Sequence, residues 1–215
     1  MDKLVIATGN AGKLREIRQL LQPLAIKVMP QADFSVPEAD EPFTTFIENA
    51  LAKARHASLH TGLAALADDS GICVEALQGA PGVHSARYAC VNENAPRSDQ
   101  RNNQKLLEML TGVKNRHAHY YCVMVLLRYA DDPQPLISEG IWQGEILHAP
   151  RGSGGFGYDP LFLDTKTDKT GAELPLEIKN RISHRGQALS KLLHKLERLD
   201  IGSNQGSAHS SGRVP

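Results

Sequence analysis

The chain has 215 residues, of which 41% are hydrophobic and 22% are charged, as is ordinary for a soluble globular protein with one substantial core. Lys plus Arg and Asp plus Glu both total 24, and this zero net charge argues against a protein that coats nucleic acid or an anionic membrane. The three cysteines are widely spaced, which favours reduced thiols over disulfides or a zinc site. With neither a membrane-length apolar run nor a signal-peptide pattern, we expect a cytoplasmic protein.

The first predicted strand, residues 4–7, runs through a glycine-containing loop, residues 8–13, into an amphipathic helix. Free backbone N–H groups at a helix N-terminus suit a phosphate. Lys13 places a positive charge in the first helical turn, where the helix dipole disfavours it unless an anion is present. The spacing is not that of a Walker A loop, so a simple tight turn remains the alternative.

An acidic, proline-containing loop, residues 36–42, follows a second predicted strand at residues 26–29 and presents Glu41 just before a helix. Thr45 and Glu48 form a capping box that starts this helix, which we expect to end near His60. Along this helix runs a polar stripe of Asn49, Lys53, His56 and His60, and most such stripes are solvated faces. We single out Lys53 in that stripe, because the helix begins beside the acidic loop.

Two adjacent carboxylates, Asp68 and Asp69, follow the apolar run of residues 63–67, where we predict that a strand gives way to a turn. Adjacent acids repel each other and lose hydration, so a hard cation is expected to compensate. On an extended backbone the two side chains point to opposite faces, and we expect Asp69 to enter the cleft. The alternative is an Asx-type turn with two solvated acids.

The middle of the chain reads as a strand at residues 72–77, a turn at 79–82 and a helix from Ser98 to Leu110. Residues 83–88 follow no assignable pattern. Two long β-rich runs, residues 117–129 and 136–147, predict an antiparallel hairpin. His117 and His119 share one strand face, but no third ligand lies nearby in sequence, which makes a metal pair the less favoured interpretation.

The segment 151–160 contains four glycines, which let a backbone pass close to a ligand, and its Phe156 and Tyr158 offer faces for a flat ring. A short strand follows at residues 161–163. Ser183 is a predicted N-cap, and the positive His184 and Arg185 at a helix start indicate either a function or a nearby acid. Residues 201–215 have low-complexity composition and are expected to be disordered.

These loops together supply two chemistries. Glu41 and the Asp68/Asp69 pair are oxygen ligands for a hard divalent cation. Positive charges are offered by Lys13, Lys53, Lys179 and Arg185. Magnesium that bridges carboxylates and substrate phosphates is the usual use of such a set, and the glycine-aromatic segment adds a slot for a base. A nucleoside triphosphate fits all of these features.

Six motifs, in order and with matching spacing, give the chain its resemblance to the inosine/xanthosine triphosphate pyrophosphatases. They are residues 8–13, 46–50 with 53–54, 67–71, 79–82, 155–160 and 183–186, and the resemblance covers about residues 3–199. It implies an α/β fold with an elongated mixed β-sheet, flanking helices and two lobes around a central cleft, in a single domain of residues 1–200.

The resemblance also implies a homodimer that uses Mg²⁺ to hydrolyse dITP, ITP and XTP to the monophosphate and pyrophosphate. Carried over to this sequence, Asp69 is the general base and a metal ligand, and Glu41 helps to hold the metal, with the adjacent Asp40 as the alternative. The implied substrate-binding residues are Thr8, Gly9, Asn10, Ala11, Gly12, Lys13, Ser70, Phe156, Gly157, Tyr158, Asp159, Lys179, His184 and Arg185. No nucleic-acid or membrane partner is expected.

Two other functions remain open. One is a pyrophosphatase for another modified nucleotide, such as a methylated pyrimidine. The other is a non-catalytic module that binds nucleotides or RNA. Both use glycine loops and basic residues, but neither readily explains Glu41 together with Asp69.

Overall fold

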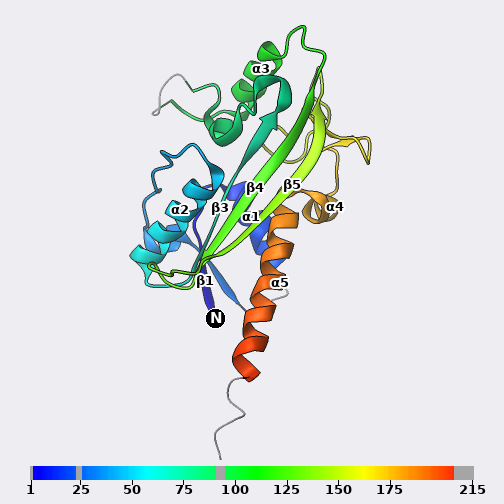
Figure 1. Cartoon of the computed structure of the whole chain (residues 1–215). Helices are drawn as coiled ribbons and strands as arrows, with labels where there is room; N and C mark the ends of the chain where they lie inside the picture. Colours follow the sequence, from blue (N-terminus) through cyan, green and yellow to red (C-terminus); the bar gives the residue numbers. More distant parts are fainter. Residues whose placement is uncertain (1, 23–25, 91–94, 206–215) are drawn as a thin grey trace, which may run out of the picture.

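The computed structural model of the chain is built on one seven-stranded sheet with helices on both faces (Figure 1). It describes residues 2–22, 26–90 and 95–205, the part from 198 onward by its backbone alone. The strand order is β2-β1-β3-β4-β5-β6-β7. The strands are β1 Lys3–Ile6, β2 Lys27–Pro30, β3 Ala65–Val74, β4 His117–Leu127, β5 Leu136–Ile146, β6 Phe162–Asp164 and β7 Lys169–Thr170.

Five α-helices and three 3-10 segments complete the described part of the chain. The helices are α1 Ala11–Leu21, α2 Phe46–Thr61, α3 Asp99–Met109, α4 Leu176–Ile182 and α5 His184–Gln205. The 3-10 segments are η1 Gln31–Phe34, η2 Glu75–Leu77 and η3 Gly82–Arg87. Among these elements, none of the helices has the length and apolar character needed to cross a bilayer.

The sheet is mixed, which confirms the predicted fold class. β1 pairs in parallel with both β2 and β3, and each later pair of neighbours is antiparallel. β4 and β5 form the predicted hairpin, and together with β3 they make the long ribbon that runs the length of the molecule (Figure 1).

The two faces of β3 face different helices, because successive side chains of a strand point to opposite sides of a sheet. Leu66 belongs to the core under α1 and α5, whereas Ala65 and Ala67 belong to the core under α2. By the same alternation Asp68 points toward α1 and α5, and Asp69 points toward α2. One pair of neighbouring residues thus reaches both sides of the sheet.

The turn predicted at residues 68–71 is wrong. β3 runs unbroken through these residues and pairs with β4, with Asp69 opposite Val123, so the strand predicted just after the turn is the continuation of the first. The glycine there serves close packing and not a turn. A Cβ on Gly71 would overlap the carbonyl oxygen of Gly82, because η3 packs directly on this part of β3.

The predicted helix starts at Thr45, Ser98 and Ser183 are confirmed. Each of these side chains accepts a hydrogen bond from a backbone N–H in the first turn of the following helix. The Thr45 hydroxyl also donates to the Glu48 carboxylate, so the two side chains of the predicted capping box are in contact. The strands predicted at residues 26–29 and 161–163 are each displaced by one residue. Residues 83–88, which followed no pattern, lie mostly in η3.

The last helix, α5, continues to Gln205, so the backbone of residues 201–205 is helical where disorder was predicted. Residues 206–215, the rest of that predicted tail, lie outside the described residues. His117 is ion-paired with Glu145, with 3.2 Å between Nδ1 and Oε1, and both side chains are exposed. The described residues contain no cluster of three or more His, Cys, Asp or Glu side chains arranged to hold a metal, at His117 or elsewhere.

The start of α5 lies against β5 at Gly140. A Cβ on Gly140 would overlap the carbonyl oxygen of His184 and come within 2.8 Å of the backbone nitrogen of Ala188. Both contacts are with helix backbone, which cannot move aside as a flexible side chain can. Gly140 therefore sets how closely α5, and the site residues at its first turn, approach the sheet.

We expect Gly140→Ala to lower the free energy of unfolding by about 1 to 3 kcal/mol, the usual cost of overpacking a core. Thermal unfolding of the purified protein measures this change. The matched control on the same strand is Ser138→Ala, because the buried Ser138 hydroxyl has no hydrogen-bond partner among the described residues and its removal costs little. Equal stability of Gly140→Ala and the parent protein would contradict the tight packing of α5 on β5.

Candidate active site

Asp69 and Glu41, the two predicted metal ligands, lie on either side of one lysine. Lys53 of α2 places its Nζ 3.1 Å from Oδ1 of Asp69 and 2.6 Å from Oε1 of Glu41. Arg87, at the end of η3, reaches Oε2 of Glu41 at 2.7 Å. Lys53, which we singled out because its helix begins beside the acidic loop, thus contacts Glu41 of that loop. We call the cavity lined by Glu41, Asp69, Lys53 and Arg87 the acidic cleft.

The two carboxylates differ in their proton affinity. Burial raises the pKa of Asp69, and the charges of Lys53 and Lys13 offset this only in part. Burial acts on Glu41 in the same direction, but Lys53, Lys13 and Arg87 together outweigh it and bring the pKa of Glu41 below its usual value. A carboxylate with a raised pKa is the better proton acceptor near neutral pH, so Asp69 is the more basic of the two carboxylates.

Asp68 has a different environment on the opposite face of β3. Its Oδ2 lies 2.9 Å from Nζ of Lys13 and 3.5 Å from Nε of Arg185, and the residue is 1% exposed. Burial alone would raise the pKa of Asp68, but Lys13 and Arg185 hold it well below its usual range. Asp68 lines neither cavity described below, whereas Asp69 lines the cleft.

A buried acid explains the unfavourable charge at the start of α5. Glu16 of α1 is 6% exposed, accepts a hydrogen bond from Arg185 and lies 3.2 Å from Nζ of Lys179. Lys179 also contacts Oδ2 of Asp159 at 2.6 Å. The positive charge at this helix start was expected to indicate either a function or a nearby acid, and for Arg185 a nearby acid is present. The same is true of Lys13 in the first turn of α1, which contacts Asp68.

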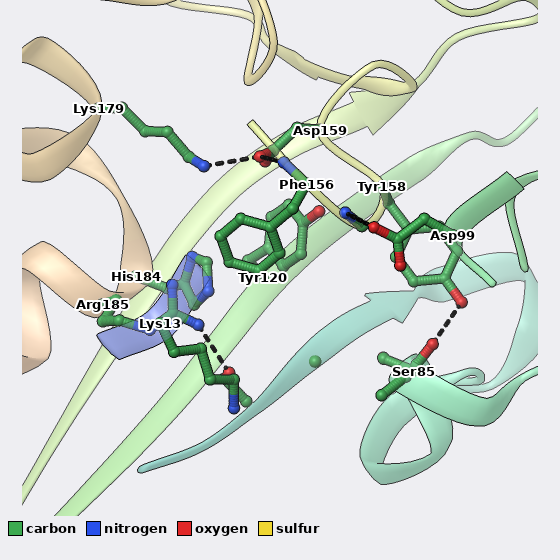
Figure 2. A pocket seen from close by; sticks show the side chains of 14 residues that line it. Lys13, Ser85, Asp99, Tyr120, Phe156, Tyr158, Asp159, Lys179, His184 and Arg185 are labelled. Carbon is green, nitrogen blue, oxygen red and sulfur yellow. Dashed lines mark hydrogen bonds and ion pairs between the residues drawn. The ribbon is translucent and has the colours of Figure 1, made fainter. Parts of the chain in front are cut away.

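A second cavity, next to the acidic cleft, is lined by aromatic rings, and we call it the aromatic pocket (Figure 2). Tyr120 of β4 stacks on His184, with 4.6 Å between ring centroids and 7° between planes. Phe156 faces the cationic groups of Lys179 and Arg185, which lie 5.0 and 5.7 Å from its ring centroid. A flat, electron-rich ring that enters this space meets stacking partners on more than one side.

His184 is the group in this aromatic pocket that is left without a partner. Its Nδ1 is buried and has no hydrogen bond among the described residues. Burial, reinforced by Arg185 and Lys179, places the pKa of His184 well below its ordinary value, so the ring is neutral. A neutral imidazole donates from one ring nitrogen and accepts at the other, and its tautomer decides which nitrogen does which.

The segment with Phe156 is tied to the N-terminal half of α3. Gly157 donates its N–H to Oδ2 of Asp99 at 2.7 Å (Figure 2). The Gly157 carbonyl accepts from Nδ2 of Asn103 at 2.9 Å. Tyr158 is 3% exposed and donates its hydroxyl to the Ser85 carbonyl at 2.8 Å. The Tyr158 ring is thus anchored within the fold at the edge of the pocket.

The predicted phosphate loop is capped by its own side chain. Oδ1 of Asn10 accepts from the backbone N–H groups of Gly12 and Lys13, at 2.8 and 3.1 Å. A phosphate bound here therefore competes with Asn10 for those two donors, which sequence reasoning treated as free. Close packing brings the carboxylate of Glu38 against Gly9, where a Cβ would overlap it.

The acidic cleft and the aromatic pocket share part of their walls. The cleft encloses about 500 Å³. Both cavities are lined by Lys13 and Ser70. Of the residues implied to bind substrate, Ala11 and Gly12 line neither cavity, and the others all line one or both. The structure thus brings together segments that are separated by most of the chain.

Sequence reasoning missed several residues of this site. They are Glu16, Arg87, Asp99 and Tyr120, and it placed Asn49 on a solvated face although the residue is 2% exposed. Glu16 had a usable signal, because it follows Lys13 by three positions and both then lie on one side of α1. The others depend on pairings between distant segments, which no local pattern encodes.

A magnesium ion fits the donors of the acidic cleft. Glu41 and Asp69 are hard oxygen donors close enough to share one ammonium group, and Mg²⁺ commonly binds to one or two carboxylates and completes its shell with waters and substrate phosphates. The shared contact with Lys53 shows that a single positive charge already lies between them.

Curated relatives are similar along nearly the whole chain. A dITP/XTP pyrophosphatase of Nitrosomonas europaea is 63% identical over 196 residues, which cover 91% of this chain and 95% of that protein. A dITP/XTP pyrophosphatase of Chromobacterium violaceum is 59% identical over 198 residues, covering 92% of this chain and 98% of that one.

Solved structures share the fold. A HAM1 protein from Coxiella burnetii superposes with a TM-score of 0.83 at 49% identity and covers 92% of this chain and all of its own. The Ham1 protein of Staphylococcus aureus superposes with a TM-score of 0.80 at 37% identity, with the same coverage of both chains. The model of the Ham1 family matches residues 4–195. With agreement over this length in both sequence and structure, the chain belongs to the Ham1 family.

Proposed function

We propose that this protein hydrolyses dITP, ITP and XTP to the nucleoside monophosphate and pyrophosphate, and so removes non-standard purine nucleotides from the nucleotide pool. The observation that carries the proposal is the junction at Lys13 and Ser70 between an aromatic pocket suited to a base and a charged cleft suited to phosphates. A substrate that fills both must have a flat ring at one end and anionic groups at the other. The names of the curated relatives support dITP and XTP as substrates.

In this proposal the base lies in the aromatic pocket and the triphosphate extends into the acidic cleft. Phe156 and Tyr120 pack on the base, and the neutral His184 uses its unpaired nitrogen to hydrogen-bond it. Lys13, in the wall shared by the two cavities, offsets charge near the α-phosphate, and Lys53 and Arg87 do so further into the cleft.

Asp69 accepts a proton from the water that attacks the α-phosphorus, and burial prepares it by raising its pKa. Glu41 and Asp69 would hold Mg²⁺, which when bound lowers the pKa of water and neutralises phosphate charge. Pyrophosphate is then the leaving group, and the cations of the cleft stabilise its developing charge.

Base selection rests on the character of the donors in the aromatic pocket. His184 and Arg185 both line this pocket and can both donate hydrogen bonds. Because Arg185 is already bonded to Glu16, Ser70 and Asp68, we assign the readout to His184, whose neutral ring lines the pocket and can donate a ring N–H to a 6-oxo group. Adenine carries a 6-amino group and would leave donor facing donor.

The proposal has two further parts. Assembly as a homodimer follows from the family resemblance, and a location in the cytoplasm, where the nucleotide pool lies, follows from the sequence features described above. Light scattering coupled to size-exclusion chromatography measures the mass of the particle, and a mass of one chain at micromolar concentration would exclude the dimer.

Comparison of the two adjacent acids tests the central assignment. We expect Asp69→Asn to lower kcat for dITP by about a hundred- to ten-thousandfold, the usual contribution of a general base, with little loss of stability. Asp68→Asn should lower kcat much less, but it should lose about 1 to 3 kcal/mol of stability, because Lys13 and Arg185 lose their buried charged partner. Pyrophosphate release and thermal unfolding are measured for both. Turnover by Asp69→Asn near the parent rate would remove Asp69 from catalysis.

The position of attack is testable with labelled water. In ¹⁸O-water we expect the label in the monophosphate and none in pyrophosphate, because the water activated by Asp69 attacks the α-phosphorus. Mass spectrometry of the two products locates the oxygen. Label confined to pyrophosphate would move the attack to the β-phosphorus, and diphosphate with orthophosphate as products would refute the proposed reaction.

The two alternative functions have their own signatures. Activity on a methylated pyrimidine triphosphate alone would favour a pyrophosphatase for another modified nucleotide, and nucleotide binding without turnover would favour a non-catalytic module.

His184→Phe keeps a flat ring beside Tyr120 but removes both ring nitrogens. We expect the ratio of kcat/KM for ITP to that for ATP to fall about tenfold or more, as expected when one buried donor that discriminates is lost. The matched control is Phe156→Ala, which removes stacking that does not depend on base identity and should weaken ITP and ATP alike. An unchanged ITP-to-ATP ratio in His184→Phe would exclude His184 from base readout.

A further inference from the structure

Asn49 of α2 joins the acidic loop to the centre of the sheet. Its side chain is buried, and its carboxamide makes three hydrogen bonds. Oδ1 accepts from the N–H of Phe43 at 3.1 Å, and Nδ2 donates to the carbonyl of Phe43 at 3.1 Å and to Oδ2 of Asp69 at 3.3 Å. One neutral side chain thus holds both backbone groups of a loop residue and one oxygen of the proposed base.

The loop depends on this contact for its position. In the described part of the chain, the main chain of residues 38–44 forms hydrogen bonds with other segments only at Phe43, through Asn49. The Phe43 side chain is 40% exposed, so apolar packing does little to fix the loop. Glu41 precedes Phe43 by two residues, and its backbone position follows from where Phe43 is held.

The orientation of the carboxamide is determined by these partners. Rotation of the amide by 180° would set Nδ2 against the N–H of Phe43 and Oδ1 against both the Phe43 carbonyl and Asp69. The pair of bonds to Phe43 therefore forces a donor toward Asp69. This donor bonds Oδ2 of Asp69, while Lys53 contacts the other oxygen, Oδ1.

We propose that Asn49 is a positioning residue that sets the distance and orientation between Glu41 and Asp69, and so shapes the site for the divalent cation. Lys53 also touches both carboxylates, but it is a cation at the place where another cation is to bind. Asn49 is neutral and approaches from the helix side, so its contacts persist when the charge between the carboxylates changes. The inference rests on the proposed metal role of Glu41 and Asp69.

The test uses the full-length protein and the variants Asn49→Ala and Asn49→Ser. We expect both to bind manganese(II), measured by electron paramagnetic resonance, about ten- to a hundredfold more weakly, the usual effect of losing a group that orients metal ligands. We expect kcat for dITP to fall with KM nearly unchanged. The matched control is Ser58→Ala, which removes an equally buried polar side chain of α2 that bonds the Leu63 carbonyl away from the site.

A second measurement does not depend on the folding of any variant. Hydrogen exchange in the parent protein should show the Phe43 amide protected by at least about tenfold relative to that of Thr44, because the Phe43 N–H is bonded to a buried oxygen. In folded Asn49 variants this protection should disappear. An unprotected Phe43 amide in the parent protein, or manganese affinity equal to the parent in both variants, would overturn the positioning role.

These results are separable from the function itself. If the parent protein released no pyrophosphate from dITP, the proposed activity would fail, whereas exchange at Phe43 would still report whether Asn49 holds the loop. If pyrophosphate release were normal in Asn49→Ala and Asn49→Ser, the activity would stand and the positioning role would be refuted.

Discussion

Two neighbouring carboxylates in the middle of a buried strand are the constraint on which the rest of this structure depends. Asp68 and Asp69 cannot avoid burial, because β3 continues past them and pairs with β4 before, at and after the two residues. Strand alternation sends them to opposite faces, so each face must supply its own positive charge. α1 and α5 supply Lys13 and Arg185 to one, and α2 supplies Lys53 to the other.

This division separates two tasks within adjacent residues. Asp68 is closed off and held ionised by its cations, which makes it part of the ionic network that joins α1, β3 and α5. Asp69 lines the cleft, with a pKa that burial raises and that its cations do not fully restore. Chemically identical side chains thus differ in role because of the helix that each one faces.

The sequence predicted the elements and most of the site, and its failures have identifiable physical causes. Capping boxes, alternation and glycine loops are local signals, and they located the helix starts, the β4–β5 hairpin and some of the residues that line the two cavities, such as Lys13, Asp69 and Phe156. The predicted turn failed because Gly71 marks a close approach of η3 to the strand, a contact between segments that local patterns cannot distinguish from a turn. Tyr120 and Asn49 were not predicted as site residues for the same reason, since their partners lie on other segments.

The packing at Gly140 has a consequence for how this enzyme can diversify. The backbone of His184 touches β5 there, and further along the same helix Ala188, Leu189 and Leu192 belong to the central core. A change in the first turn of α5 that altered base preference would also disturb the packing that keeps the protein folded. Phe156 itself belongs to none of the core clusters, and the neighbouring Gly157 is bound to α3 by two hydrogen bonds. New substrate preferences in descendants of this chain are therefore more accessible through substitutions in the segment around Phe156 than through α5.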